Sequence, residues 1–293
     1  MNQMSATAPG TVSKYLSLVK FSHTIFALPF ALIGFTLAVV YEQQTFHWYQ
    51  LLLMLLCMVF ARSAAMAFNR YLDRRYDARN PRTAIREVPA GIISPRQALI
   101  FTIICSLLFV LCTYLINTIC FLLSPVALFV ILFYSYTKRF TALCHLVLGV
   151  GLALAPIGAY LTVTGYFDIL PLFFSFAVLT WVSGFDIIYA LQDEAFDRGQ
   201  QLHSIPVALG ARKALRVSNL LHIVSALFVI IAGIYAQFGL FYWLGVLVFA
   251  SMLVYQHTLV KPNDLSKVNI AFMTANGIAS IVFAALVITD LLC

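Results

Sequence analysis

Two short stretches of the sequence carry aspartates at regular spacing. In the first, Asn69, Asp73 and Asp77 follow one another at intervals of four residues, and in the second Asp193 and Asp197 are again four apart. On a helix, side chains four residues apart lie on the same face, so each stretch would present a row of oxygen atoms in one direction. Carboxylates stacked in this way repel one another unless a cation lies between them. Both rows are therefore candidate cation sites.

The candidate metal ligands in these rows are all oxygen atoms, which restricts the kinds of metal ion that would bind. Magnesium binds one or two carboxylates and completes its octahedral shell with water and substrate phosphates. Manganese fits the same donors. The six cysteines form no C-x-x-C pair and most lie inside apolar runs, so they predict neither a metal cluster nor disulfides. We expect a Mg²⁺ site, with Mn²⁺ as an alternative, that also binds a phosphorylated ligand.

Basic side chains surround both rows. Arginine and lysine suit phosphate oxygens, although anchoring at a membrane surface explains many of them equally well. Arg62 is different because it lies inside an apolar run, seven residues before Asn69 and on the same face. An arginine at such a position needs an anionic partner or ligand. We therefore expect Arg62 to have a role in the site.

A fifth acidic residue, Asp186, lies inside an apolar run seven residues before Asp193, and Tyr189 continues the same region. A buried aspartate there would contact the metal, orient a second substrate, accept a proton, or pair with Arg62 as a structural ion pair. The sequence leaves these four roles open.

The composition indicates what kind of chain holds these residues. Hydrophobic residues make up 62% of the 293 positions and charged residues 10%, with a mean hydropathy of +0.94. A soluble domain carries roughly 25% charged residues, so this chain cannot cover itself with a wetted surface. Apolar runs of about 20 residues, each able to cross a ~30 Å hydrocarbon core, recur along it. They cover residues 22–40, 49–69, 97–116, 118–136, 142–163, 169–190, 214–236, 239–257 and 268–290.

These runs predict an all-α polytopic membrane protein of about nine transmembrane helices, because runs of this length are too long for barrel strands. We interpret residues 1–293 as a single transmembrane domain. Asp193 follows Asp73 by 120 positions, and Asp197 follows Asp77 by the same 120 positions. The first motif lies at the end of the second apolar run, and the second motif lies at the end of the sixth. This repeat suggests two four-helix units that place facing carboxylate rows across a central cavity, with a ninth helix added.

The basic residues also predict an orientation. Lysine and arginine lie near the N-terminus and in the loops after the second, fourth, sixth and eighth runs, whereas the other loops contain none. By the positive-inside rule the N-terminus and both carboxylate stretches are cytoplasmic, as in a bacterial inner (cytoplasmic) membrane protein. The net charge of +7 is explained by topology and the lipid bilayer, so it does not indicate a nucleic acid partner.

The two stretches together resemble the signatures of the UbiA superfamily of membrane prenyltransferases. The first is Asn69-x3-Asp73-x3-Asp77 followed by Arg82, Thr83 and Arg86, and the second is Asp186-IIYALQ-Asp193-x3-Asp197 followed by His203-Ser-Ile-Pro. With nine runs in the same order, the resemblance covers nearly the whole chain. It implies an all-helical bundle in which an allylic diphosphate ionises and an aromatic ring captures the resulting cation.

The resemblance also implies roles for particular residues. The metal and diphosphate would be held, with two Mg²⁺ ions, by Asn69, Asp73, Asp77, Asp193 and Asp197. Further diphosphate contacts would come from Arg62, Lys138 and Arg139. Beside the resemblance, we expect the catalytic residues to be Asp73, Asp77, Asp193, Asp197 and Asp186, and we expect Tyr189 to contact a substrate. The substrates would be a polyprenyl diphosphate and a small aromatic acid. Nothing in the sequence gives the prenyl chain length or the oligomeric state.

The acceptor stays open. Residues 21–32 and the first signature resemble the 4-hydroxybenzoate polyprenyltransferase branch, some of whose members prenylate a dihydroxynaphthoate in menaquinone synthesis instead. Glu87 follows Arg86 where the ubiquinone-pathway form has proline. Haem O or chlorophyll-type prenylation is a further alternative. A transporter with intramembrane charges is the rival from another class, although coupling sites in transporters lie near the midplane rather than at one membrane face.

Overall fold

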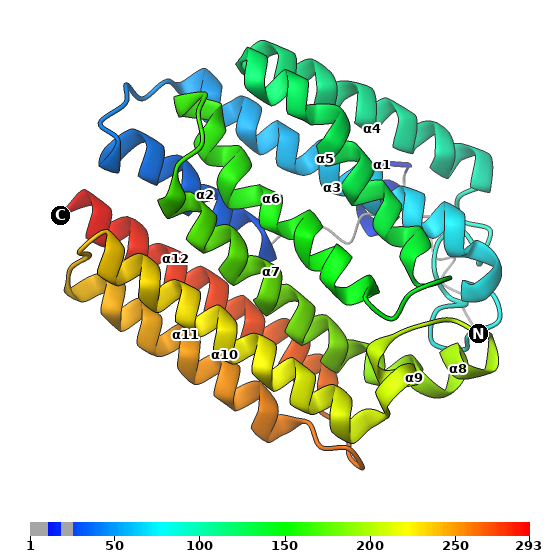
Figure 1. The fold of residues 1–293 in the computed structure, drawn as a ribbon. Helices are drawn as coiled ribbons and strands as arrows, with labels where there is room; N and C mark the ends of the chain where they lie inside the picture. The colour runs from blue at the N-terminus through cyan, green and yellow to red at the C-terminus, as the bar shows by residue number, and fades with distance from the viewer. Residues whose placement is uncertain (1–10, 19–25) are drawn as a thin grey trace, which may run out of the picture.

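The computed structural model describes residues 11–18 and 26–293, and Figure 1 shows its long helices side by side in one bundle. Within these residues, eight helices are long and apolar enough to cross a membrane. They are α3 (Trp48–Asp77), α4 (Pro95–Ile116), α5 (Thr118–Thr137), α6 (Cys144–Thr164), α7 (Ile169–Ala190), α10 (Ala211–Tyr235), α11 (Leu240–Leu259), and the π-helical segment η4 (Ile270–Ala275) continued by α12 (Asn276–Leu292). The predicted all-α membrane fold is confirmed.

The first predicted run is shorter than expected. It forms α2 (Leu28–Thr36) and the π-helical segment η2 (Leu37–Tyr41), while the predicted positions 22–25 lie outside the described residues. Pro29 lies in the first turn of α2, where a missing backbone N–H costs no helical hydrogen bond. This segment brings the apolar helices in the described part of the chain to nine, in agreement with the predicted number.

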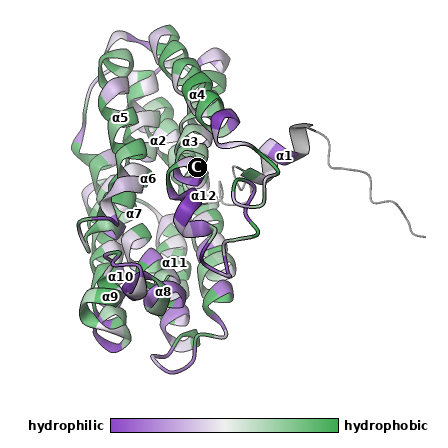
Figure 2. Cartoon of the chain, turned by 90° about the vertical axis from the view of Figure 1, so that its right-hand side faces the viewer, coloured by the Kyte–Doolittle hydropathy of each residue, from purple (hydrophilic) through white to green (hydrophobic). Residues whose placement is uncertain are grey.

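The remaining elements are short. They are α1 (Thr11–Leu18), the 3₁₀ turn η3 (Leu191–Asp193), α8 (Glu194–Gly199) and α9 (Ile205–Leu209). The helices α8 and α9 lie at the same end of the bundle as the long loop that follows α3 (Figure 1). Hydrophilic residues lie on α8 and the neighbouring loops, whereas the long helices behind them are mostly hydrophobic (Figure 2). One end of an otherwise apolar bundle is therefore polar.

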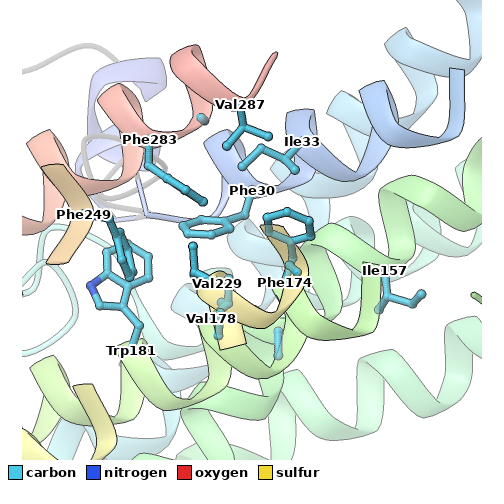
Figure 3. Packing of buried hydrophobic residues seen from close by; sticks show 14 of the residues in the cluster. Phe30, Ile33, Ile157, Phe174, Val178, Trp181, Val229, Phe249, Phe283 and Val287 are labelled. Carbon is cyan, nitrogen blue, oxygen red and sulfur yellow. The ribbon is translucent and has the colours of Figure 1, made fainter. Parts of the chain in front are cut away.

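A cluster of aromatic side chains holds the bundle together around α7 (Figure 3). The rings of Phe30, Trp181 and Phe283 are buried, and Phe30 lies 5.4 Å from Trp181 and 5.8 Å from Phe283 between ring centroids. The Trp181 Nε1–H donates to Asn276 Oδ1 at 2.8 Å, so the buried indole nitrogen is satisfied across to α12. These contacts tie α2, α7 and α12 together.

The helix α7 also approaches α6 closely. A Cβ atom at Gly149 would lie 2.5 Å from the carbonyl oxygen of Leu179 and 2.3 Å from Ser183 Oγ, so only glycine permits this spacing. On its other side α7 packs against α10, just as α3 packs against α4. The helix α3, which carries the first carboxylate row, and the helix α7, which precedes the second, thus each pack on a neighbouring long helix. The ends of α3 and α7 are fixed by this packing.

Candidate active site

A cavity of about 720 Å³ opens at the polar end of the bundle, where α3 and α7 end. Every residue that the sequence singled out for the site lines it, namely Arg62, Asn69, Asp73, Asp77, Lys138, Arg139, Asp186, Tyr189, Asp193 and Asp197. Residues more than 100 positions apart are thus brought to one place.

The first carboxylate row lies on an unbroken helix. Because α3 continues to Asp77, the side chains of Asn69, Asp73 and Asp77 share one face, as the four-residue spacing predicts. The Asn69 amide donates from Nδ2 to Asp73 Oδ2 at 3.0 Å. Its side-chain oxygen accepts a hydrogen bond from Arg70 Nη1 at 3.2 Å. The row is therefore ordered by its own hydrogen bonds.

The second row does not lie on one continuous helix, which is the condition under which a four-residue spacing places both side chains on one face. The helix α7 ends at Ala190, Asp193 closes the 3₁₀ turn η3, and Asp197 lies on the separate helix α8. The 3₁₀ turn separates α7 from Asp193, and Asp193 is the N-cap residue of the helix α8 that carries Asp197. Both carboxylates are nevertheless buried and face the cavity.

Three motif carboxylates form ion pairs with basic side chains from neighbouring segments. Arg86 Nη1 lies 2.7 Å from Asp77 Oδ1, Lys138 Nζ lies 2.8 Å from Asp197 Oδ1, and Arg139 Nη2 lies 3.3 Å from Asp73 Oδ1. A buried carboxylate without a partner costs several kcal/mol, and these cations offset that cost in both rows. They also place positive charge along the cavity wall, where phosphate oxygens would bind.

The fourth carboxylate is bound by Arg82, which connects the two motifs. Its guanidinium contacts both oxygens of Asp193, with Nε 2.9 Å from Oδ1, and its Nη1 donates to the Tyr189 hydroxyl at 3.0 Å. Burial alone would lower the pKa of Arg82, but the hydrogen bonds and charge of Asp193 and the Tyr189 hydroxyl raise it above its usual value. Asn80 donates to Asp193 Oδ1 at 3.0 Å. The loop after the first motif thus orients the second.

Asp186 is paired with a histidine. Its Oδ2 lies 2.7 Å from His145 Nδ1, and His145 Nε2 accepts a longer hydrogen bond from the Ile205 backbone N–H at 3.4 Å. Asp186 therefore has a hydrogen-bond partner, His145, other than Arg62, with which the sequence left a structural ion pair open. His145 lines the cavity, and the sequence gave no signal for this because an isolated histidine in an apolar run usually only bonds a neighbouring helix.

The donor set fits a hard divalent ion. The buried atoms Asp77 Oδ2 and Asp197 Oδ2 accept no hydrogen bond from any described residue. Among the same residues, no group of three His, Cys, Asp or Glu side chains converges as it would in an all-protein metal cage. Magnesium commonly takes only one or two carboxylates and completes its shell with water and phosphate. The oxygens therefore suit an ion that is shared with a phosphorylated ligand.

Behind this polar mouth the cavity walls are apolar. On α3 the lining residue farthest from the aspartate end of the helix is Arg62, and the apolar Met66 lies between it and Asn69. The deeper wall is formed by Leu148, Leu152, Val182, Phe185 and Phe272. A ligand with an anionic head and a hydrocarbon tail matches this division.

The sequence does not single out two residues of the loop after α3 that bind Asp193. Arg82 is one of many arginines near the first motif, and Asn80 lies outside the four-residue spacing of its aspartates. Their partner, Asp193, is 111 and 113 positions away, so no local pattern reveals the contact. The Asn80-Pro81 turn was the only local signal that this loop folds back on itself.

Known proteins match this chain along most of its length. The model of the UbiA prenyltransferase family matches residues 27–278. A curated relative from Francisella tularensis, named 4-hydroxybenzoate octaprenyltransferase, is 31% identical over 61% of this chain, and the match spans 63% of that relative's length. A protein of the same name from Nitrosomonas europaea is 30% identical over 82% of each chain.

Two solved structures share the fold. The apo structure of a UbiA homologue from Aeropyrum pernix K1 is 31% identical, has a TM-score of 0.83, and covers 92% of this chain and 98% of its own. A UbiA homologue from Archaeoglobus fulgidus, bound to GPP and Mg²⁺, is 20% identical with a TM-score of 0.73 over 96% of this chain and 100% of its own. The helical arrangement is thus common to all three proteins.

Proposed function

The chain belongs to the UbiA prenyltransferase family, and we propose that it transfers a polyprenyl chain from an allylic diphosphate to the ring of an aromatic acid of the 4-hydroxybenzoate type. The observation that carries this proposal is the cavity itself, in which two carboxylate rows and their cations meet an apolar wall. The names of the two curated relatives support the aromatic acid. A transporter function has no such support.

We propose that the diphosphate head binds between the two motifs. The Mg²⁺ ligands would be Asn69, Asp73 and Asp77 on one side and Asp193 and Asp197 on the other, and the homologue from Archaeoglobus fulgidus bound to Mg²⁺ supports a divalent ion. When bound, the metal would neutralise charge on the diphosphate leaving group. Two ions are proposed because there are two rows, and Mn²⁺ would fit the same oxygens.

The basic side chains would hold the remaining phosphate oxygens. Arg62, Lys138 and Arg139 all line the cavity, and Arg62 is the lining residue of α3 that lies farthest from the aspartate end of the helix. In this position its guanidinium would contact the diphosphate close to the C–O bond that breaks. The apolar walls would enclose the prenyl chain and keep water away from the cation that forms.

The acceptor would lie beside Asp186 and Tyr189. Tyr189 is fixed by Arg82 and by stacking on Phe272, with ring centroids 4.2 Å apart, so it offers a rigid aromatic surface. Asp186 is held by His145 and faces the cavity, where it would orient the acceptor or accept its ring proton. The new bond joins the prenyl carbon to a ring carbon, and the proton leaves that carbon.

The test of this proposal is a transfer assay. Purified protein with Mg²⁺ and a long polyprenyl diphosphate should convert 4-hydroxybenzoate to a product heavier by one prenyl chain, measured by mass spectrometry. A dihydroxynaphthoate in the same assay decides between ubiquinone and menaquinone synthesis, because Glu87 departs from the ubiquinone-pathway sequence. A protein that is folded but prenylates no aromatic acid would contradict the proposal.

We also propose that the cavity opens to the cytoplasm in a bacterial inner membrane. The basic residues that line the cavity or flank it lie at one end of the bundle, as the positive-inside rule requires. Cysteine-accessibility mapping should place residues 73–95 and 193–212 on the cytoplasmic side and Cys293 outside. A cytoplasmic Cys293 would contradict the proposed orientation.

A further inference from the structure

One buried acid in the cavity belongs to neither aspartate row. Glu87 lies in the loop after α3, is only 5% exposed, and lines the cavity. Its Oε1 accepts a hydrogen bond from Ser17 Oγ on α1, while its Oε2 accepts none from any described residue. A buried carboxylate oxygen without a partner costs free energy, so its retention calls for an explanation.

An unsatisfied donor faces this oxygen. Arg70 is 4% exposed and also lines the cavity, and its Nε finds no hydrogen-bond acceptor within the described chain. The distance from Arg70 Nε to Glu87 Oε2 is 3.9 Å, too long for a hydrogen bond. One oxygen atom about 2.8 Å from each would bridge this gap.

The chemistry of the two atoms selects the bridging group. Arg70 Nε only donates and the Glu87 carboxylate only accepts, so the bridging oxygen must accept one hydrogen bond and donate another. A hydroxyl group does both. A carboxylate or an ether oxygen has no proton to donate, and a carboxylate would also be repelled by Glu87.

We propose that Glu87 and Arg70 bind the ring hydroxyl of the aromatic acceptor, and that Glu87 is therefore a specificity-determining residue. This inference rests on the proposed function and goes beyond it by assigning the group that recognises the acceptor. Arg70 Nη1 also donates to Asn69 Oδ1 at 3.2 Å, so the pair adjoins the first aspartate row. A hydroxyl bound here would hold the neighbouring ring carbon near the first aspartate row, where the diphosphate is proposed to bind.

The test compares two acceptors that differ only in the hydroxyl. Calorimetry should show that the wild-type protein binds 4-hydroxybenzoate at least about tenfold more tightly than benzoate, which corresponds to one hydrogen bond to a charged group. Glu87→Gln keeps the size of the side chain but replaces the charged acceptor with a weaker neutral one. It should remove most of this preference, raise KM for 4-hydroxybenzoate by about 10- to 100-fold, and leave KM for the polyprenyl diphosphate unchanged.

A matched control separates recognition from a structural role. Ser17→Ala removes the hydrogen bond that ties α1 to Glu87 but keeps the carboxylate, so it should retain the preference for the hydroxyl. Equal loss of preference in Ser17→Ala and Glu87→Gln would reduce Glu87 to an anchor for α1 and overturn the proposal.

One outcome would overturn the inference about Glu87, and a different one would overturn the proposed function. If wild-type protein binds benzoate and 4-hydroxybenzoate equally, a water molecule fills the gap and the inference is wrong. Because binding is measured without turnover, this result is independent of the proposed function, which fails instead if no aromatic acid is prenylated.

Discussion

The two aspartate motifs have the same spacing in the sequence but different structures. The first lies on the unbroken helix α3, whereas the second is divided between the turn η3 and the helix α8. The loop after the first motif supplies Arg86 to its own Asp77 and Arg82 to Asp193 of the second. Among the described residues, the segment after the second motif supplies no such cation in return, because Arg198 on α8 pairs with Glu194 at 3.0 Å and donates to the Val207 carbonyl oxygen. The two motifs repeat the same spacing but are not structurally equivalent, because the loop after the first motif binds carboxylates of both.

The largest effect should come from removing one carboxylate from either motif. Asp73→Asn or Asp193→Asn should lower kcat by more than the roughly 100-fold that loss of an outer-shell partner costs, because each side chain would hold the metal directly. Prenyl transfer at limiting Mg²⁺ measures this. Near-normal turnover in both variants would contradict the proposal that the carboxylates of the two motifs hold the metal.

A smaller effect is expected at Arg62, which belongs to the first motif's helix. Arg62→Ala should lower kcat/KM for the polyprenyl diphosphate by about 10- to 100-fold, the range for a lost hydrogen bond between charged groups. Arg96 is an exposed arginine at the start of α4, so Arg96→Ala is the matched control and should change little. Similar losses in both variants would mean that Arg62 contributes only positive charge, as Arg96 does, and makes no specific contact with the diphosphate.

The connection between the motifs is tested at Arg82. Arg82→Lys keeps the charge but loses the two-pronged contact with Asp193, and should lower kcat/KM by about 10-fold. The exposed Arg79 lies in the same loop and donates a hydrogen bond to Gln200 Oε1 at 3.1 Å, so Arg79→Lys serves as its control. If the Arg79 variant loses as much activity, the effect does not depend on the specific contact between Arg82 and Asp193.

The smallest effect on catalysis should come from the packing that positions α7. Gly149→Ala forces a Cβ into the Leu179 backbone and should destabilise the protein by about 1–3 kcal/mol. Gly158→Ala on the same helix meets open space and should be neutral or slightly stabilising. Thermal unfolding in detergent measures both, and an equal Tm for the two variants would contradict the close α6–α7 contact.

Much of this arrangement follows from local patterns in the sequence. Hydropathy predicts the nine apolar helices, and the four-residue spacing places Asn69, Asp73 and Asp77 on one face because α3 is regular there. The same rule does not reveal that α7 ends at Ala190. Nor does it reveal that Arg82 and Asn80 bind Asp193, because these partners come from a distant loop. The pairs His145–Asp186 and Arg70–Glu87 were hidden for the same reason. Spacing predicts local geometry, but contacts between segments arise only when the bundle folds.

The central claim is that both motifs hold one diphosphate together. Its most direct test is a double-mutant cycle on binding, with the affinity for polyprenyl diphosphate measured against Mg²⁺ concentration in wild type, Asp73→Asn, Asp193→Asn and the double variant. We predict that each single variant loses Mg²⁺-dependent binding and that the double variant is little worse than either. Independent, additive losses would show that the two motifs bind separately and would contradict the account.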